Sequence, residues 1–534
     1  LMQDQVENLK KKGIKAFCVF SGMSAREIDI TLDNAVYGDG KFLYVSPERL
    51  TTDLFKARVE KMNVNLIAID ESHCISQWGY DFRPSYLHIA DLREQLFGIP
   101  VLALTATATP QVVEDIQTKL KFKEFNVFQK SFERDNLAYL VRFDENKLGR
   151  LLRIVNNVKG SGIVYVRNRK KTVEISHFLH EQSITAKYYH AGMSYAEREF
   201  AQESWKKGDA RVMVATNAFG MGIDKPDVRF VLHLEPPDSL EAYFQEAGRA
   251  GRDEQPSFAV LLYDDADILE KRKYIDRQFP PAKEIKRVYN AIANSYNIPV
   301  GGGENSSFPF DIANFCKKYN LKPISVLNAL KLMEREEWIA LNESFHQPSR
   351  VSINMEGHEL YDFQVRNVAY DLFIKTLLRS YSGLFDNFVS IREQNIAQKL
   401  KISVDQVKSK LKALHKMSVL SYEEQSDKPR ITFISQRLAS DRLFLSPEHY
   451  VHRKKEALLK WEAVENYISS RDRCRSTILL SYFGENKEQR CGICDICREM
   501  NKMDISEYEF EKMSEAIFPV VKSYLKILLN SIRV

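Results

Sequence analysis

The 534-residue chain lacks several features that would place it in a class at once. It has no run of about 18 apolar residues, which argues against a membrane-spanning helix. No secretory signal is visible at its start, and because the first residue is Leu1 rather than Met we expect a fragment. A formal net charge of +5 neither requires nor excludes nucleic acid, so any basic binding surface must be local.

Cysteine is scarce, with seven residues, and unevenly distributed. Three stand alone in the sequence, and the other four cluster near its end: Cys474, Cys491, Cys494 and Cys497. An odd total with one cluster indicates a reducing compartment and a metal site rather than a disulfide framework. Four thiolates at this spacing suit a tetrahedral structural Zn²⁺ site. An iron–sulfur cluster is the alternative, and free thiols are the third reading.

Two stretches alternate short apolar runs with helical patterns, which predicts an α/β fold with parallel sheets. In a first domain, residues 1–130, we expect strands at 16–20, 42–45, 66–69 and 101–105. In a second domain, residues 131–270, we expect strands at 162–166, 186–189, 211–215, 230–234 and 257–262.

Residues 271–450 have a helical character, interrupted by a flexible break at 301–303. Two similar units there read helix, turn, helix, strand, with the strands at 338–341 and 419–422. We expect residues 430–434 to return as the other wing strand of the second unit. This winged-helix pattern often binds DNA, although a helical spacer that only packs is the alternative. A helical zinc-binding module, 451–500, and a tail, 501–534, complete the expected organisation.

The expected strand at 66–69 ends in an acidic motif that contains Asp70, Glu71 and His73. Ligands of α/β sheets bind at the carboxyl ends of the strands. One carboxylate there can hold Mg²⁺, and the next can orient an attacking water. Such a pair alone is weak evidence of a functional site, but three further motifs accompany it. These are 105–109, with Thr-Ala-Thr; 215–224, with Gly222 and Asp224; and 245–252, with Gln245, Arg249 and Arg252.

The order of these motifs resembles superfamily 2 helicases. Residues 74–84 are similar to the aromatic-rich loop of RecQ-family DNA helicases, which narrows the resemblance. Residues 1–6, 46–50 and 132–137 resemble further RecQ motifs, so the resemblance covers residues 1–267 continuously. It implies two RecA-like motor domains, the first incomplete, and an ATP-dependent 3′-to-5′ helicase for replication, recombination or repair. Its cofactors would be ATP, Mg²⁺ and Zn²⁺, and its partners single-stranded and duplex DNA, without a membrane. Its location would be cytoplasmic, or at the nucleoid if bacterial.

The resemblance also implies roles for individual residues. Asp70, Glu71, His73, Gln245, Arg249 and Arg252 would be catalytic, and Gly222 and Asp224 would contact the nucleotide. The aromatic-rich loop would couple binding of single-stranded DNA to ATP hydrolysis through Ser76, Gln77, Trp78, Phe82 and Arg83. Its chemistry fits this role, because aromatic rings can stack on unpaired bases and an arginine can meet a phosphate.

Two departures from the family pattern stand out. The P-loop pattern G-x-x-x-x-G-K-[ST] occurs nowhere, so we expect a chain truncated before the P-loop and inactive by itself. The cysteine cluster follows the helical insert, whereas in better-known relatives the zinc module follows the second motor domain directly. A non-catalytic DNA-binding remnant and an RNA helicase of the same superfamily stay open as alternatives.

Overall fold

The computed structural model describes residues 2–20, 23–76, 78–79, 82–220, 225–342, 349–381, 383–385, 389–424, 429–502, 512, 514–519 and 521–522. The chain forms two compact units: Leu1–Arg272 together with Glu456–Val534, and Lys273–Lys455. The divisions fall inside helices α10 (Asp265–Gln278) and α18 (Arg453–Ser469).

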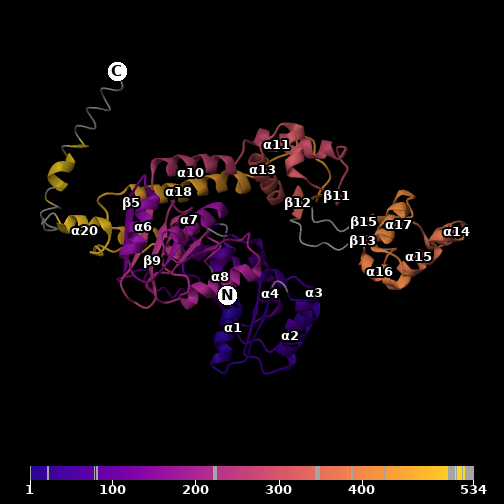
Figure 1. The fold of residues 1–534 in the computed structure, drawn as a ribbon, viewed down its shortest axis with the longest axis horizontal. Helices are drawn as coiled ribbons and strands as arrows, with labels where there is room; N and C mark the ends of the chain where they lie inside the picture. Colours follow the sequence, from indigo (N-terminus) through magenta and orange to yellow (C-terminus); the bar gives the residue numbers. More distant parts are fainter. Residues whose placement is uncertain are drawn as a thin grey trace, which may run out of the picture. The chain divides into compact units, whose positions relative to one another are not determined.

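The first α/β domain contains two parallel strand pairs, β1 (Ala16–Val19) with β2 (Phe42–Val45) and β3 (Ile67–Ile69) with β4 (Val101–Ala103). All four strands lie within the expected ranges. Five helices pack with them: α1 (Met2–Lys11), α2 (Ala25–Tyr37), α3 (Asp53–Val59), α4 (His88–Gln95) and α5 (Pro110–Lys119), drawn in the darkest colours of Figure 1. The carboxyl ends of β3 and β4 therefore lie at the same edge of one strand pair.

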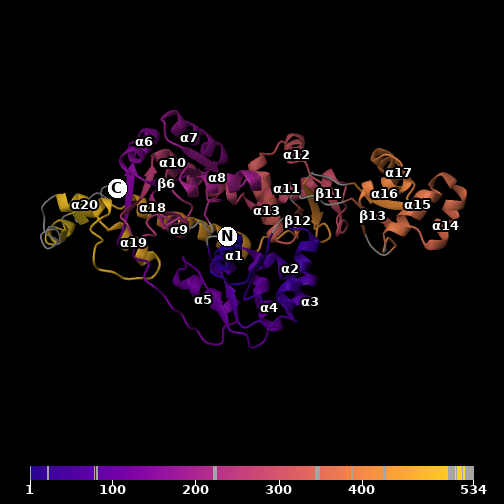
Figure 2. The same ribbon diagram turned by 60° about the horizontal axis from the view of Figure 1, so that its bottom comes forward.

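The second α/β domain is built on a six-stranded parallel sheet in the order β5-β10-β9-β6-β8-β7. Its strands are β5 (Leu137–Phe143), β6 (Ser161–Tyr165), β7 (Ala186–Tyr189), β8 (Val212–Ala215), β9 (Val228–His233) and β10 (Ser257–Tyr263). The helices are α6 (Lys147–Asn157), α7 (Arg169–Glu181), α8 (Tyr195–Lys207) and α9 (Leu240–Ala247), several of which are labelled in Figure 2. Every residue of β8 is buried, as expected for a central parallel strand covered on both faces. The predicted α/β class with parallel sheets is confirmed.

One strand was missed by the sequence analysis. β5 is the apolar run Leu-Ala-Tyr-Leu-Val-Arg-Phe, which combines aromatic and β-branched residues. Its composition carried the signal, but only its first residue belongs to residues 132–137, the segment that we matched to a RecQ motif.

The second unit contains two winged-helix-like folds with separate cores. The first comprises α11 (Ala282–Ser295), α12 (Ile312–Tyr319), α13 (Pro323–Arg335) and a sheet ordered β11 (Ser307–Pro309), β16 (Arg430–Phe433), β12 (Ile339–Asn342). The second comprises α14 (Gly357–Arg366), α15 (Val368–Ser380), α16 (Glu393–Leu400), α17 (Val404–Lys416) and a sheet ordered β14 (Val389–Ser390), β13 (Arg350–Ile353), β15 (Leu420–Glu423). The predicted helix–turn–helix–strand order is present in both.

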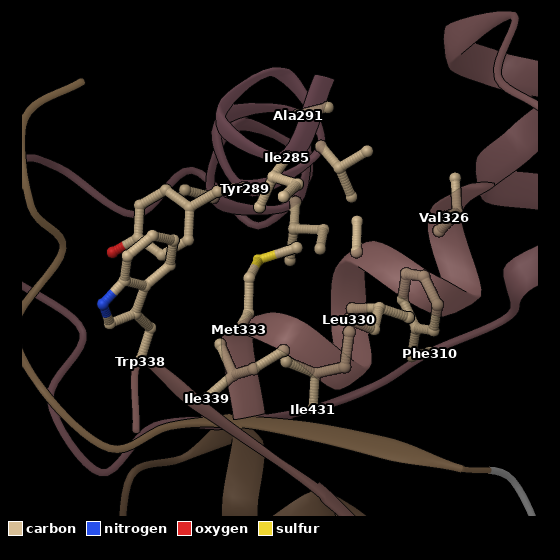
Figure 3. Packing of buried hydrophobic residues seen from close by; sticks show 14 of the residues in the cluster. Ile285, Tyr289, Ala291, Phe310, Val326, Leu330, Met333, Trp338, Ile339 and Ile431 are labelled. Carbon is tan, nitrogen blue, oxygen red and sulfur yellow. The ribbon is translucent and has the colours of Figure 1, made fainter. Parts of the chain in front are cut away.

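The predicted partner of residues 430–434 was wrong. β16 pairs with β11 and β12 of the first fold, whereas β15 pairs with β13. Ile431 and Phe433 are fully buried in the first core, where Ile431 lies near Ile339 (Figure 3). The second fold is therefore inserted between the wing strands β12 and β16 of the first. β12 and β15 each follow a helix–turn–helix pattern, so either could be the expected partner of β16 from the sequence. Only packing distinguishes them.

Candidate motor site and metal centre

The acidic motif follows β3 at its carboxyl end, as expected. Glu71 has a φ of 49°, in the left-handed region that is uncommon for a residue with a side chain. Its backbone N–H donates to Asp70 Oδ1 at 2.9 Å, and the Tyr86 hydroxyl donates to the Asp70 carbonyl at 3.3 Å. Such a backbone conformation persists only where surrounding contacts determine it, and it is common at functional sites.

His73 connects this motif to the Thr-Ala-Thr motif after β4. Its side chain is 1% exposed, and its Nδ1 lies 3.0 Å from Thr105 Oγ1 and 3.3 Å from Glu71 Oε2. Thr105 Oγ1 also accepts a hydrogen bond from the Thr107 backbone at 3.3 Å. The two strand ends are thus joined by side-chain contacts around one buried imidazole.

The second α/β domain reaches the same carboxylate. Gln245, on α9, donates from Nε2 to Glu71 Oε1 at 3.3 Å. The adjacent Glu246 lies 2.8 Å from His233 Nε2 at the end of β9, which orients this part of α9. Glu71, His73 and Gln245, which lie far apart in the sequence, therefore meet at one place.

The two arginines of residues 245–252 differ in environment. Arg249 is 5% exposed and lies beside Gly220, where an added Cβ would come within 3.1 Å of Arg249 Nη2. Arg252 is exposed. Gly222 and Asp224 lie outside the described residues.

Arg134 is a functional candidate that the sequence analysis did not single out. Its guanidinium donates to the carbonyls of Gly248, Ala250 and Gly251 at 3.3, 3.0 and 2.8 Å. Asn136 Nδ2 adds a second donor to the Gly251 carbonyl at 2.7 Å. Together they hold the turn that follows α9 and carries the two arginines. Arg134 lies within residues 132–137, which resemble a RecQ motif, but that resemblance did not indicate its contacts with the turn after α9.

The aromatic-rich loop is described in part, with Gln77 outside the described residues. Trp78 is 40% exposed, whereas Ser76 is fully buried and its Oγ accepts from the Trp78 N–H at 3.2 Å. Phe82 and Arg83 are partly buried. Among the described loop residues, Trp78 thus has the accessible ring, and Ser76 shapes the backbone.

The four clustered cysteines meet. All four Sγ atoms lie within 4.8 Å of one another, and those of Cys474 and Cys494 are 3.9 Å apart. A tetrahedral site with Zn–S bonds of about 2.3 Å requires sulfur atoms about 3.8 Å apart. The thiolate is the form of cysteine that binds metal. The donor set fits structural zinc.

Two short helices position these ligands. α19 (Arg475–Tyr482) begins directly after Cys474, and α20 (Asp495–Lys502) begins directly after Cys494. The Cys491 and Cys494 N–H groups donate to the sulfur atoms of Cys474 and Cys491 at 3.3 and 3.4 Å. Donors to thiolate sulfur stabilise its charge and fix the ligand geometry.

A buried ion pair lies within the zinc module, and its carboxylate also contacts the second α/β domain. Arg475 is 0% exposed, and its Nε and Nη2 donate to the two carboxylate oxygens of Asp495 at 3.1 and 3.2 Å. Asp495 Oδ2 also accepts from the Val141 N–H of β5 at 3.3 Å. The carboxylate therefore bridges the metal centre and the sheet.

Replacing Arg475 with methionine should lower the free energy of unfolding by about 3–5 kcal/mol. The buried Asp495 carboxylate then loses its two-pronged partner and keeps only Arg142, whose Nη1 lies 3.5 Å from Oδ2. Urea denaturation, with the zinc content measured in parallel, checks this. Arg150 pairs with Asp144 at a site where the arginine is 40% exposed, so Arg150→Met is the control and should cost about 1 kcal/mol or less. Equal losses in the two variants would contradict a structural role for the buried pair.

Comparison with known proteins supports this arrangement. Residues 1–116 match the DEAD/DEAH box helicase family, and 146–254 match the helicase conserved C-terminal domain. Residues 351–424 match the RecQ helicase winged-helix domain of Bacteroidota, and 425–498 match the RecQ zinc-binding family.

Three similar relatives are each named ATP-dependent DNA helicase RecQ. That of Bacillus subtilis is 44% identical over 279 residues, covering 52% of this chain and 47% of the relative. That of Haemophilus influenzae is 40% identical over 289 residues, covering 54% and 47%. That of Pasteurella multocida is 40% identical over 291 residues, covering 53% and 46%. The chain thus spans about half the length of these relatives.

Two parallel-sheet domains joined by the hydrogen bond from Gln245 to Glu71, together with the two helicase-domain matches, define a helicase motor core. The zinc-binding and winged-helix matches and the relatives are more specific. The chain is similar to the RecQ family of DNA helicases in these matches, and its four clustered cysteines all lie within the match to that family's zinc-binding module.

The match to the DEAD/DEAH box family begins at residue 1, so it lends no support to the expected truncation ahead of a P-loop. The expectation that the chain is inactive by itself likewise has no support from the comparisons. No helix among the described residues is long and apolar enough to cross a membrane.

Proposed function

We propose that this protein is an ATP-dependent DNA helicase that moves 3′ to 5′ and unwinds duplex DNA during replication, recombination or repair. The observation that carries the proposal is the hydrogen bond from Gln245 on α9 to Glu71 after β3. It joins Glu71, which is suited to activating water, to the second α/β domain, which must move when nucleotide binds. Such a contact fits a motor that couples hydrolysis to domain motion.

Within this proposal, the acidic motif divides the chemistry. Asp70 would hold Mg²⁺, and Glu71 would orient the attacking water. The buried His73 ring contacts both the Glu71 carboxylate and the Thr105 hydroxyl, and so fixes their positions relative to each other. ATP and Mg²⁺ supply the reacting phosphate and its charge neutralisation, while these side chains hold the water and the metal.

The second domain completes the proposed site. Gly222 and Asp224 contact the nucleotide, and Arg249 and Arg252 face its phosphates. We favour Arg252 as the arginine finger, since it is exposed whereas Arg249 is packed beside Gly220. An arginine finger contributes about a thousandfold or more to the rate in related phosphoryl-transfer enzymes.

DNA would bind through the aromatic-rich loop, where Ser76, Gln77, Trp78, Phe82 and Arg83 form the proposed contact, and through the winged-helix-like folds. The accessible Trp78 ring supports stacking on single-stranded bases. A protein that acts on DNA in this way would work in the cytoplasm, at the nucleoid in a bacterium. The domain division at 130, 270, 450 and 500 is part of the same proposal.

A strand-displacement assay with duplexes that carry either a 3′ or a 5′ single-stranded tail tests the function. Residues 1–534 are assayed as they stand and joined to an upstream P-loop-bearing segment, because the P-loop pattern does not occur among them. ATP-dependent displacement of the 3′-tailed DNA duplex alone is the expected result. Displacement of RNA duplexes instead would favour an RNA helicase, and DNA binding without hydrolysis in both forms would favour a non-catalytic remnant.

A further inference from the structure

A lysine of the zinc module holds the backbone of the aromatic-rich loop. Lys460, on α18, donates from Nζ to the Trp78 carbonyl at 2.8 Å and to the Gly79 carbonyl at 3.1 Å. Its third donor goes to Glu456 Oε1 at 2.7 Å, one helical turn earlier. An ammonium group has three donors, so all of them are used. All of these residues belong to the first unit.

This contact is shielded from water and sits at a tight turn. The side chains of Lys460 and Glu456 are only 17% and 16% exposed, and such a pair is screened less than a surface pair. At Gly79, an added Cβ would lie 2.4 Å from the His73 carbonyl oxygen. The Trp78–Gly79 turn therefore packs closely against the backbone of the acidic motif, and Lys460 holds its carbonyl groups.

The same helices also reach α9. Burial, and then the charges of Glu241 and Glu456, raise the pKa of the Tyr482 hydroxyl on α19. Glu241 is 3% exposed and lies one turn before Gln245 on α9. The rings of Phe244 on α9 and Phe483 after α19 are 5.0 Å apart.

We propose that Lys460 is a positioning residue that holds the Trp78–Gly79 turn for base stacking, within a zinc module whose Phe483 also contacts Phe244 of α9. This rests on the proposed function and deepens it. The zinc module then supports the aromatic-rich loop through Lys460 and contacts α9, which carries Gln245, through Phe483. Spatial continuity by itself does not prove coupling, so the test measures position and DNA binding separately.

The position of the loop is measured by hydrogen–deuterium exchange in the peptide that contains Trp78 and Gly79. Both backbone N–H groups donate within the loop, to Ser76 Oγ and to the Ser76 carbonyl. These hydrogen bonds slow the exchange of both amides, so a displaced turn would be detected as faster exchange. Lys460→Met keeps the aliphatic stem and removes the donors, and exchange of this peptide should accelerate severalfold. Lys460→Arg restores donors and should return exchange towards the parent. Lys455→Met, an exposed lysine of the same helix, is the control and should change nothing.

DNA binding is measured by fluorescence anisotropy with a labelled oligothymidylate and the 534-residue chain. Trp78→Ala removes the stacking platform and should weaken binding by about fivefold or more. Lys460→Met leaves the ring present but unplaced, and should weaken binding by about two- to tenfold, since the loop must then be ordered on binding. Lys460→Arg should recover most of this loss.

Faster exchange with weaker binding, both reversed by Lys460→Arg, supports the proposal. Unchanged exchange in Lys460→Met overturns it, whatever happens to the affinity. Faster exchange with unchanged affinity, while Trp78→Ala weakens binding, overturns the role in presenting the ring. If the parent chain binds no oligothymidylate, the proposed function fails, and the exchange result alone decides whether Lys460 positions the turn.

Discussion

Replacing Glu71 with glutamine is expected to abolish ATP turnover while nucleotide binding persists. Glutamine keeps the shape of the side chain but cannot accept a proton or carry the charge that orients the attacking water. Loss of a positioned acid–base group typically costs about a hundredfold or more in rate. The variant is measured in whichever form of the protein hydrolyses ATP, with DNA-stimulated phosphate release and titration of a fluorescent ATP analogue.

The matched control for Glu71→Gln is Asp91→Asn on α4, because it makes the same carboxylate-to-amide change at a side chain that is 75% exposed. It should leave turnover unchanged. If Glu71→Gln hydrolyses ATP at a rate close to the parent, the assignment of the acidic motif is wrong. Loss of nucleotide binding together with turnover would instead point to a disrupted fold around His73.

Loss of the metal is expected to have the largest effect on stability. Cys494→Ser should remove zinc from the module and sharply lower the yield of folded protein, because Cys494 is fully buried among the other three ligands. Zinc binding to small structural sites contributes about 10–16 kcal/mol in peptides at neutral pH, and this free energy becomes folding free energy. Thermal denaturation and elemental analysis measure the two effects together.

Cys18→Ser is the control for the metal, because Cys18 is an isolated, partly exposed thiol of the first domain. It should retain both zinc and stability. The parent should be colourless, with about one zinc per chain, as four thiolates around one ion require. Brown protein that contains iron would indicate an iron–sulfur cluster instead of zinc. Folded protein without metal would contradict both assignments.

The motor motifs and the metal ligands could be predicted from the sequence because each signal is local. A short apolar run followed by Asp70 and Glu71 marks the carboxyl end of a strand. The close spacing of three cysteines places their thiols on one turn, and a helix directly after Cys474 supplies the fourth. In such cases a few consecutive residues determine both the backbone and the direction of the side chains.

Other features depended on residues far apart in the chain. Gln245 and Glu71, Lys460 and Trp78, and Asp495 and Val141 meet only after the domains have formed. Each contact is a single hydrogen bond or ion pair, so it imposes no periodicity that a sequence could reveal.

The sequence by itself determined that this protein has two parallel α/β domains, an acidic strand-end motif, an aromatic-rich loop and a four-cysteine metal site. Only the tertiary structure decided which wing receives β16, which side chains surround Glu71, and what holds the Trp78–Gly79 turn. The physical reason is that strand periodicity and ligand spacing act within a few residues. The partner of a strand or a buried charge, in contrast, is selected by burial and packing across the whole unit.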